Sequence, residues 1–179
     1  MSDAANQYGT ALYELAKDEA LVPQILSELE TLKGIFAREP QFPVLLATPS
    51  VSKEERCRIL DEVLRGKVHP YLLNFMKILT EKGYMKQFDR CCQVFRKLYN
   101  EENGILCVTA VTSVPLSDEL KAKLQQKLSS VTGKTIDLSC RLDPTCLGGV
   151  RLDFDGKQVD GTIRRRLEDV RSLLKNTVL

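Results

Sequence analysis

The stretch NGILCVTAVT, from Asn103 to Thr112, marks a change from helical to strand-like sequence. Before it, apolar residues recur three and four positions apart, which is the spacing of an amphipathic helix. After Gly104 the residues are β-branched or apolar on both faces, as is typical of a strand inside a sheet. The sequence therefore predicts an α+β chain in two parts. An N-terminal six-helix bundle covers residues 1–104, and a small α/β C-terminal domain covers residues 105–179.

Capping and helix-ending residues divide the first part into helices. Ser52 and Glu55 form a capping box, in which each side chain can bond the other residue's backbone amide. Gly83 is expected to end a helix that is apolar nearly all round and therefore central. The expected helices cover about residues 3–18, 23–38, 42–47, 53–65, 70–82 and 84–103. The inward stripe of the first helix is expected to hold Tyr8, Ala11, Leu12, Leu15 and Ala16.

The second part has the pattern of a β-α-β-β-α unit. Its first helix follows Ser117, and a half-buried strand around Ile136 alternates apolar and polar residues. Gly148 and Gly149 open a third strand, and Asp155-Gly156 is typical of a tight turn. A last helix is expected over residues 162–174. The inward residues of the first helix are expected to be Leu120, Leu124, Leu128 and Val131.

Composition excludes several classes of protein. The chain has 179 residues, of which 43% are hydrophobic and 28% charged, as in an average globular protein. No apolar run is long enough to span a bilayer, and the N-terminus has neither a signal-peptide nor a transit-peptide pattern. The net charge of +2 gives no general attraction to nucleic acid or anionic lipid. Because no secretory signal pattern accompanies them, the six cysteines are expected to be reduced thiols that serve as small apolar residues.

The sequence shows no catalytic or cofactor site. His69 is the only histidine, and no partner for a nucleophilic triad or dyad lies near it in the sequence. Zinc-type C-x-x-C pairs and phosphate-binding glycine motifs are both absent. Gly148 and Gly149 are therefore expected to serve backbone geometry, such as a positive φ. We expect no catalytic residue, no metal site and no cofactor, which argues against a small cytosolic enzyme.

A basic run, Arg164-Arg165-Arg166, lies on the expected last helix. It could bind phosphates, pair with an acidic partner helix, or simply be solvated. Aromatic residues make up only 6% of the chain and tryptophan is absent, which argues against an RNA-reading sheet. A nucleic-acid-associated adaptor that uses this basic C-terminal helix nevertheless stays open as an alternative function.

Several stretches, in order and spacing, resemble the δ subunit of bacterial F-type ATP synthase, the counterpart of the mitochondrial oligomycin-sensitivity-conferring protein. The resemblance covers essentially the whole chain. Its most specific part is C-terminal, from VTAVTSVPL at Val108–Leu116 onward. The other matching stretches are YGTALYELA at 8–16, LLATPSVSKEE at 45–55, NFMKILTEKG at 74–83, LGGV at 147–150 and DGTIRRRL at 160–167.

This resemblance implies a stator subunit without catalytic activity. It links the α3β3 catalytic head to the membrane-anchored b-subunit peripheral stalk, so that rotor torque from proton flow drives ATP synthesis. Residues 1–104 would bind the N-terminal segment of the α subunit as an amphipathic helix, and residues 105–179 would face the b subunits. The protein would be peripheral, at the cytoplasmic face of the bacterial cell membrane, and would touch the membrane only through the complex.

The resemblance also implies site residues. The α-subunit helix would lie between the first and fifth helices, where some of the implied residues must face the core instead. Arg164, Arg165 and Arg166 would pair with an acidic b helix, and Gly148, Gly149, Asp160 and Gly161 would hold the fold. The residues implied for the α-subunit helix are Tyr8, Leu12, Tyr13, Phe75, Ile78 and Leu79.

Two positions depart from the family pattern. Gln7 stands where a basic residue is usual, and Gly9 stands where a helix-forming residue is expected. Glycine within a helix costs about 0.5–1 kcal/mol relative to alanine. We therefore expect the first helix to be loose until a partner binds.

Overall fold

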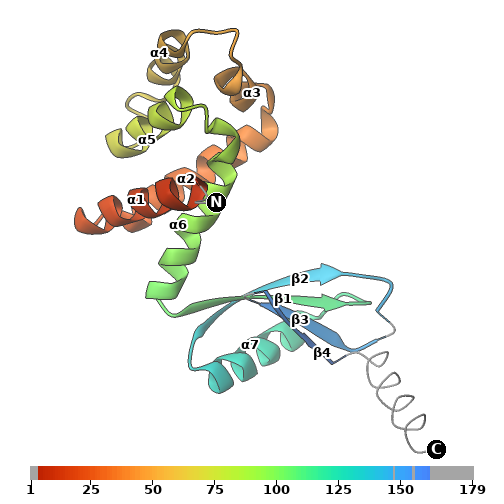
Figure 1. Cartoon of the computed structure of the whole chain (residues 1–179). Coiled ribbons are helices and arrows are strands. Elements are labelled where there is room, and N and C mark those ends of the chain that lie inside the picture. Colours follow the sequence, from red (N-terminus) through yellow and green to blue (C-terminus); the bar gives the residue numbers. More distant parts are fainter. Residues whose placement is uncertain (1–3, 147, 155, 162–179) are drawn as a thin grey trace, which may run out of the picture. The chain divides into compact units, whose positions relative to one another are not determined.

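A computed structural model describes residues 4–146, 148–154 and 156–161 (Figure 1). The chain divides into two compact units between Tyr99 and Asn100, here called the helical unit and the sheet unit. The helical unit contains helices alone apart from one isolated bridge between Arg65 and Val68, and the sheet unit contains a four-stranded sheet with one described helix. The prediction of an α+β chain is confirmed.

The helices of the first part agree with the predicted ranges except at one place. The predicted helix over residues 84–103 begins later than expected, at Phe88, because the short 3-10 turn η1 (Met85–Gln87) takes the place of its first turn. Before it, Gly83 adopts a positive φ of 75° at the end of the fifth helix. The Tyr84 amide bonds back to the Leu79 carbonyl at 2.7 Å, which completes the helix end. The α-helices are α1 (Ala4–Asp18), α2 (Val22–Arg38), α3 (Gln41–Ala47), α4 (Lys53–Leu64), α5 (Pro70–Glu81) and α6 (Phe88–Glu102).

Side chains at the helix starts satisfy backbone amides that have no partner within the helix. Ser52 Oγ accepts a hydrogen bond from the Glu55 amide at 3.1 Å, so this half of the predicted capping box is confirmed. His69 caps α5, since its Nδ1 accepts from the Tyr71 amide at 3.3 Å. The only histidine therefore has a structural role in the described chain.

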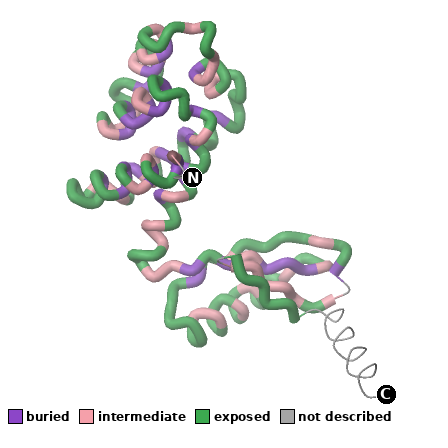
Figure 2. The backbone as a smooth tube through the Cα atoms, in the orientation of Figure 1, coloured by how far each residue is buried: buried purple, intermediate pink, exposed green. Residues whose placement is uncertain are grey.

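The core of the helical unit collects one face of each helix, and Figure 2 shows the buried residues gathered where the helices meet. Phe95 of α6 is fully buried, and the Tyr13 ring of α1 meets it edge-on at a centroid distance of 5.2 Å. From α5 the core takes Leu72, Met76 and Leu79. This apolar centre agrees with the prediction that the fifth helix is central.

Gly9 lets α1 approach α6 closely. A Cβ at this position would lie 2.9 Å from the Cys91 carbonyl oxygen and 2.9 Å from Val94 Cβ. Both distances are too short for real carbon contacts. The missing side chain at Gly9 is therefore what allows α1 to pack against α6. The expectation that the first helix is loose until a partner binds stays a prediction.

Replacing Gly9 by alanine should lower the free energy of unfolding by about 1–3 kcal/mol through overpacking. Gly34 of α2 is the matched control, since apart from its own neighbours in the helix no atom lies within 4 Å of the place that a Cβ would take there. Gly34→Ala should raise the free energy of unfolding by about 0.5–1 kcal/mol through helix propensity. Urea denaturation followed by circular dichroism measures both, and a stabilised Gly9→Ala protein would contradict the close approach.

A charged cluster joins α4 to α5. Lys77 Nζ lies 2.6 Å from Asp61 Oδ2, and Arg65 Nη2 lies 3.3 Å from Asp61 Oδ1. The hydrogen bond from Lys77 lowers the pKa of the Asp61 carboxyl below its usual value. A lowered folded-state pKa means that this carboxylate stabilises the fold above its unfolded pKa, and that the contribution is lost as pH falls through the folded pKa.

Asp61→Asn should therefore destabilise the protein at pH 7 and have a much smaller effect at an acid pH where the wild-type carboxyl has taken up its proton. Urea midpoints of the two proteins at both pH values measure this. Glu62→Gln is the control on the same helix, because Glu62 is more exposed and its ion pair with Arg58 in the described chain is a long one of 3.9 Å. An equal loss at both pH values would contradict the assignment.

The sheet has the strand order β2-β1-β3-β4, with α7 (Asp118–Thr132) against one face (Figure 1). Strand β1 lies inside the sheet, parallel to β2 and antiparallel to β3, which confirms the prediction of an interior strand. The fourth strand was not predicted. It pairs with β3 across the predicted turn at Gly156. The strands are β1 (Ile105–Thr112), β2 (Thr135–Leu142), β3 (Val150–Phe154) and β4 (Lys157–Asp160).

Helix α7 is less buried than its apolar stripe predicts. Leu124 and Leu128 are half-buried, but Leu120 and Val131 are 53% and 77% exposed, so the prediction that these two face inward is wrong for the described chain. The fully buried cluster beneath the helix contains only Leu106, Val108 and Ile136, too few to cover four helical turns. The predicted helix over residues 162–174 lies outside the described residues.

Candidate partner-binding surfaces

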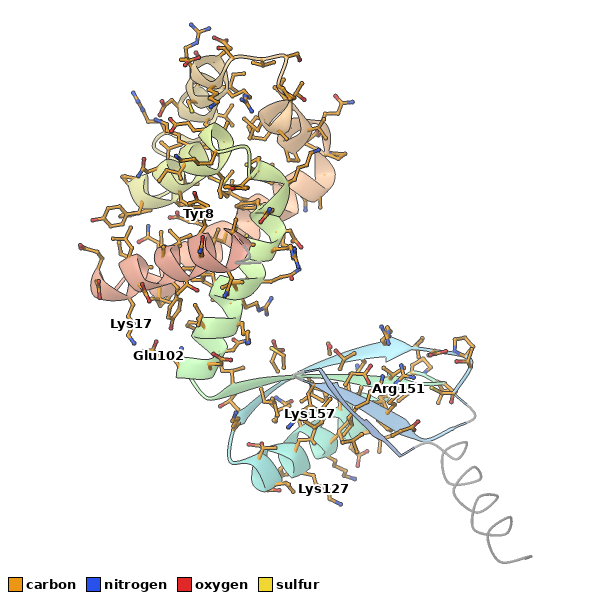
Figure 3. All side chains as sticks on the ribbon, viewed as in Figure 1. Tyr8, Lys17, Glu102, Lys127, Arg151 and Lys157 are labelled. Atoms are coloured by element: carbon orange, nitrogen blue, oxygen red, sulfur yellow. The ribbon has the colours of Figure 1, made fainter. Side chains whose placement is uncertain are left out.

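Helix α1 presents two apolar faces. Its core face consists of Ala5, Gly9, Leu12, Tyr13 and Ala16. Ala11 and Leu15 were predicted to face inward with them but are exposed, Leu15 by 40%. Tyr8 is half-buried and packs against the edge of the core. Figure 3 labels Tyr8 on this helix.

Aromatic and aliphatic side chains outside the fully buried core also occur on α5 and the turn after it. Ile78 of α5 is half-buried, and Tyr84 is 36% exposed. The Tyr8 and Tyr84 rings pack against each other with centroids 5.7 Å apart. We call Tyr8, Ala11, Leu15, Ile78 and Tyr84 the α1/α5 strip.

The structure sorts the six residues that the family resemblance implies for partner binding. Tyr8 and Ile78 lie at the surface, within the α1/α5 strip. The other four are at least nine-tenths buried, so they belong to the hydrophobic core and pack the helices together. These four are Leu12, Tyr13, Phe75 and Leu79.

A second apolar surface lies elsewhere in the helical unit. A cavity of about 1090 Å³ opens between α2, α3, α4 and the turn after α4. Its exposed aliphatic lining includes Ile35, Val44 and Val63. This cavity was not predicted from the sequence. The sequence signal that could have indicated the cavity is the presence of these aliphatic residues on helix faces that do not meet the core.

The residues assigned to fold maintenance in the sheet unit occupy the ends of strands. Gly148 and Gly149 have φ values of 99° and 90°, where a side chain would be strained. The Gly161 amide donates to the Val150 carbonyl at 3.1 Å, and a Cβ on Gly161 would lie 3.1 Å from that oxygen. Asp160 ends β4 opposite Arg151. These geometries support the fold-critical assignment, which stays a prediction.

Paired charges occupy the sheet face opposite α7. Asp153 Oδ1 lies 3.3 Å from Arg151 Nε, and Asp153 Oδ2 lies 3.6 Å from Arg141 Nη2. Figure 3 labels Arg151 on β3 and Lys157 at the start of β4. Arg164, Arg165 and Arg166, predicted to bind b subunits, lie outside the described residues.

The six cysteines are free thiols. Cys91, Cys92 and Cys146 are buried, as expected for small apolar residues, and burial raises the pKa of Cys92 to about 12. Cys107 and Cys140 are exposed, contrary to that expectation, because they lie on strands whose outer residues are uncovered in the described chain. A thiol with a raised pKa is a poor nucleophile, so Cys92 serves packing.

Neither a metal-binding cluster nor a membrane-spanning helix occurs in the described ranges. Within residues 4–146, 148–154 and 156–161, no group of three or more histidine, cysteine, aspartate or glutamate side chains could hold a metal ion. Across the same part of the chain, no helix combines enough length and apolarity to span a bilayer.

Comparison with protein families identifies the chain. The family model described as "ATP synthase delta (OSCP) subunit" matches residues 4–174. The chain belongs to the ATP synthase delta (OSCP) subunit family. Members of this family are stator subunits in the peripheral stalk of F-type ATP synthase, so this chain has a structural and not a catalytic role. Nothing in the comparisons supports the alternative of a nucleic-acid-associated adaptor.

Relatives named "ATP synthase subunit delta" match over nearly their whole length. The protein from Fusobacterium nucleatum is 31% identical over 170 residues, which covers 95% of this chain and 97% of the relative. The protein from Alkaliphilus oremlandii is 30% identical over 175 residues, which covers 98% and 97%. The sequence similarity to delta subunits therefore extends over nearly the whole chain.

A solved structure is similar in fold. A chain from the cryo-EM structure of the Toxoplasma gondii mitochondrial ATP synthase hexamer matches with a TM-score of 0.75. The match covers 97% of this chain and 98% of that chain, with 20% sequence identity. This likeness supports the fold, and the family match supports the role within the ATP synthase complex.

Proposed function

We propose that the helical unit binds the N-terminal segment of the ATP synthase α subunit, and that residues 105–179 bind the b subunits of the peripheral stalk. The predicted domain over residues 1–104, which includes the helical unit, corresponds in this proposal to the six-helix bundle of the family fold. The subunit then lies at the cytoplasmic face of a bacterial cell membrane, attached through its partners.

The α1/α5 strip carries the first half of this proposal. Leu12, Phe75 and Leu79 are already buried in the core. Leu15 and Ile78 lie outside it, so they can contact a partner without the unfolding of any helix. Exposed aromatic and aliphatic side chains along a helix surface suit the apolar face of an amphipathic partner helix. The strip therefore can bind a partner while the core stays intact.

Stable attachment under rotary load sets the energetic demand on this contact. Nanomolar affinity corresponds to about −12 kcal/mol, and interfaces reach it through a few buried aromatic and aliphatic anchors. Tyr8 and Tyr84, which already pack ring against ring, present such an aromatic surface. Because the two rings already contact each other, their side chains lose less conformational entropy when a partner binds.

Leu15→Asp and Ile78→Asp should each weaken binding of an α-subunit N-terminal peptide by about tenfold or more while leaving the fold intact, because they place a charge in the apolar contact. Val44→Asp is the matched control, since Val44 is an exposed aliphatic residue of the separate α2/α3/α4 cavity. Isothermal titration calorimetry with the peptide measures the affinities. Wild-type affinity in both folded variants would refute the assignment of this strip.

The b-subunit half of the proposal rests on the sequence of the last segment, where Arg164, Arg165 and Arg166 could pair with acidic residues of a b helix. Reversing these charges should weaken b binding most at low ionic strength, since salt screens exposed ion pairs. Affinity for a soluble b fragment, measured at two salt concentrations, tests this. Unchanged binding at low salt would contradict the assignment of the three arginines as contacts of the b subunits.

Reconstitution tests the function of the whole chain. Membranes depleted of this subunit are combined with catalytic heads, with and without the purified protein. Proton-driven ATP synthesis should return only when the protein is added. The Leu15→Asp protein, added in the same way, should restore less synthesis at limiting concentration, and full recovery without any added protein would overturn the proposal.

A further inference from the structure

The exposed apolar face of α1 ends in acidic side chains. Residues three apart are neighbours on a helix surface, so a row of every third residue winds from one face to the next. One such row of α1 begins at Leu12, which is 4% exposed, passes Leu15, which is 40% exposed, and ends at the exposed Asp18. The neighbouring row has the same order and consists of Tyr8, Ala11 and Glu14. Two carboxylates therefore border the part of the α1/α5 strip that α1 provides.

These two carboxylates have no ion-pair partner within residues 4–146, 148–154 and 156–161. Glu14 and Asp18 are one helical turn apart, about 6 Å along the axis, so both point outward on nearly the same side of α1. Some other exposed charges of the helical unit are paired across helices. Lys33 Nζ of α2, for example, lies 2.7 Å from Asp89 Oδ1 of α6. Glu14 and Asp18 are therefore available to pair with a separate chain.

The basic residue of α1 lies on the opposite side of the helix. Lys17 follows Tyr8 by about two and a half helical turns, which places the two side chains on opposite faces. Figure 3 agrees, since it labels Tyr8 on one side of α1 and Lys17 on the other. Lys17 therefore lies farther from the strip than either carboxylate, and the acidic border of α1 keeps its charge.

The α5 side of the strip carries both signs of charge. A row of every third residue on α5 begins at the buried Phe75, passes the half-buried Ile78 and ends at the exposed Glu81. Lys82 follows at the end of this helix and is also exposed. Glu81 Oε1 lies 3.8 Å from Cys57 Sγ, so this carboxylate is turned toward α4. The net negative charge along the strip therefore lies on its α1 side.

This asymmetry specifies the chemistry of a partner helix. The apolar face of an amphipathic helix suits the strip itself. The flank beside α1 then meets Glu14 and Asp18, where lysine or arginine forms opposite-charge pairs and an acidic residue forms like-charge contacts. Because a helix lying along α1 repeats its side chains every three or four residues, two basic residues at that spacing can reach both carboxylates. Exposed pairs of this kind contribute more to specificity and association rate than to total affinity.

We propose that the partner of the α1/α5 strip is an amphipathic helix with lysine or arginine along the flank that faces α1, and that Glu14 and Asp18 fix its rotation about its own axis. The apolar strip supplies most of the affinity, and the two carboxylates decide which flank of the partner lies beside α1. This proposal rests on the proposed function, since it takes the strip as the contact for the α-subunit segment, and it adds the charge pattern that this segment carries.

Two synthetic amphipathic peptides test the charge preference by isothermal titration calorimetry. They share one apolar face and differ only in one flank, which carries lysines in one peptide and glutamates in the other. At low ionic strength the full-length protein should bind the lysine peptide about tenfold more tightly, and salt should reduce this ratio toward one. The whole chain has a net charge of +2, so its overall charge would favour the glutamate peptide. Equal affinities, or tighter binding of the glutamate peptide, would overturn the proposal.

Removal of the two carboxylates tests their role directly. Glu14→Gln/Asp18→Asn should lower the preference for the lysine peptide to about twofold or less, because both peptides then meet a neutral border. Glu54→Gln/Glu62→Gln on α4 is the matched control, since it removes the same charge from exposed positions of another helix and should keep the preference. Circular dichroism confirms that each variant is folded. A preference that survives in the first variant, or that is lost equally in the control, contradicts the assignment.

Two further titrations distinguish the charge pattern from the α-subunit contact. Leu15→Asp should weaken both synthetic peptides, since it places a charge in the apolar contact that they share, and binding that ignores this change overturns the proposal. An α-subunit N-terminal peptide should displace the lysine peptide from the wild-type protein. Failure to displace it, with the charge preference intact, would overturn the α-subunit contact but support the partner chemistry. Displacement without any charge preference would overturn the charge pattern alone.

Discussion

The close approach of α1 to α6 at Gly9 is the constraint on which the helical unit depends. With no side chain at this position, one face of α1 lies directly against the backbone of α6 near Cys91. This face of α1, which includes Leu12 and Tyr13, is therefore buried in the core. Leu15 and Ala11 consequently remain outside. The packing of α1 against the core is thus separate from the surface proposed for partner binding.

Features set by short-range signals were predictable from the sequence. The Ser52 cap, the positive φ at Gly83 and the interior position of β1 follow from patterns within a few residues. The break before α6 was missed, because an apolar helical pattern continues through Met85 and hides the 3-10 turn. Strand β4 was missed since its four residues are mostly polar and only its pairing with β3 defines it.

The candidate site was less predictable, because helical spacing alone cannot tell which of two adjacent apolar faces meets the core. Tyr8 and Ile78 were named from family resemblance and lie outside the fully buried core, whereas Leu15 was wrongly assigned inward and Tyr84 was not singled out. Arg56 shows the same difficulty for buried residues. Its guanidinium is buried and donates to the Leu46 carbonyl at 2.8 Å, although nothing in its sequence surroundings distinguishes it from a solvated arginine.

The order of the strands has a consequence for synthesis on the ribosome. Strand β1 is made first, yet both of its neighbours, β2 and β3, are made later. Its apolar residues, such as Val108 and Val111, therefore emerge from the exit tunnel with no strand to receive them, while the helices made before it can already fold. A nascent chain in which β1 has been made but β2 has not would therefore need a chaperone most.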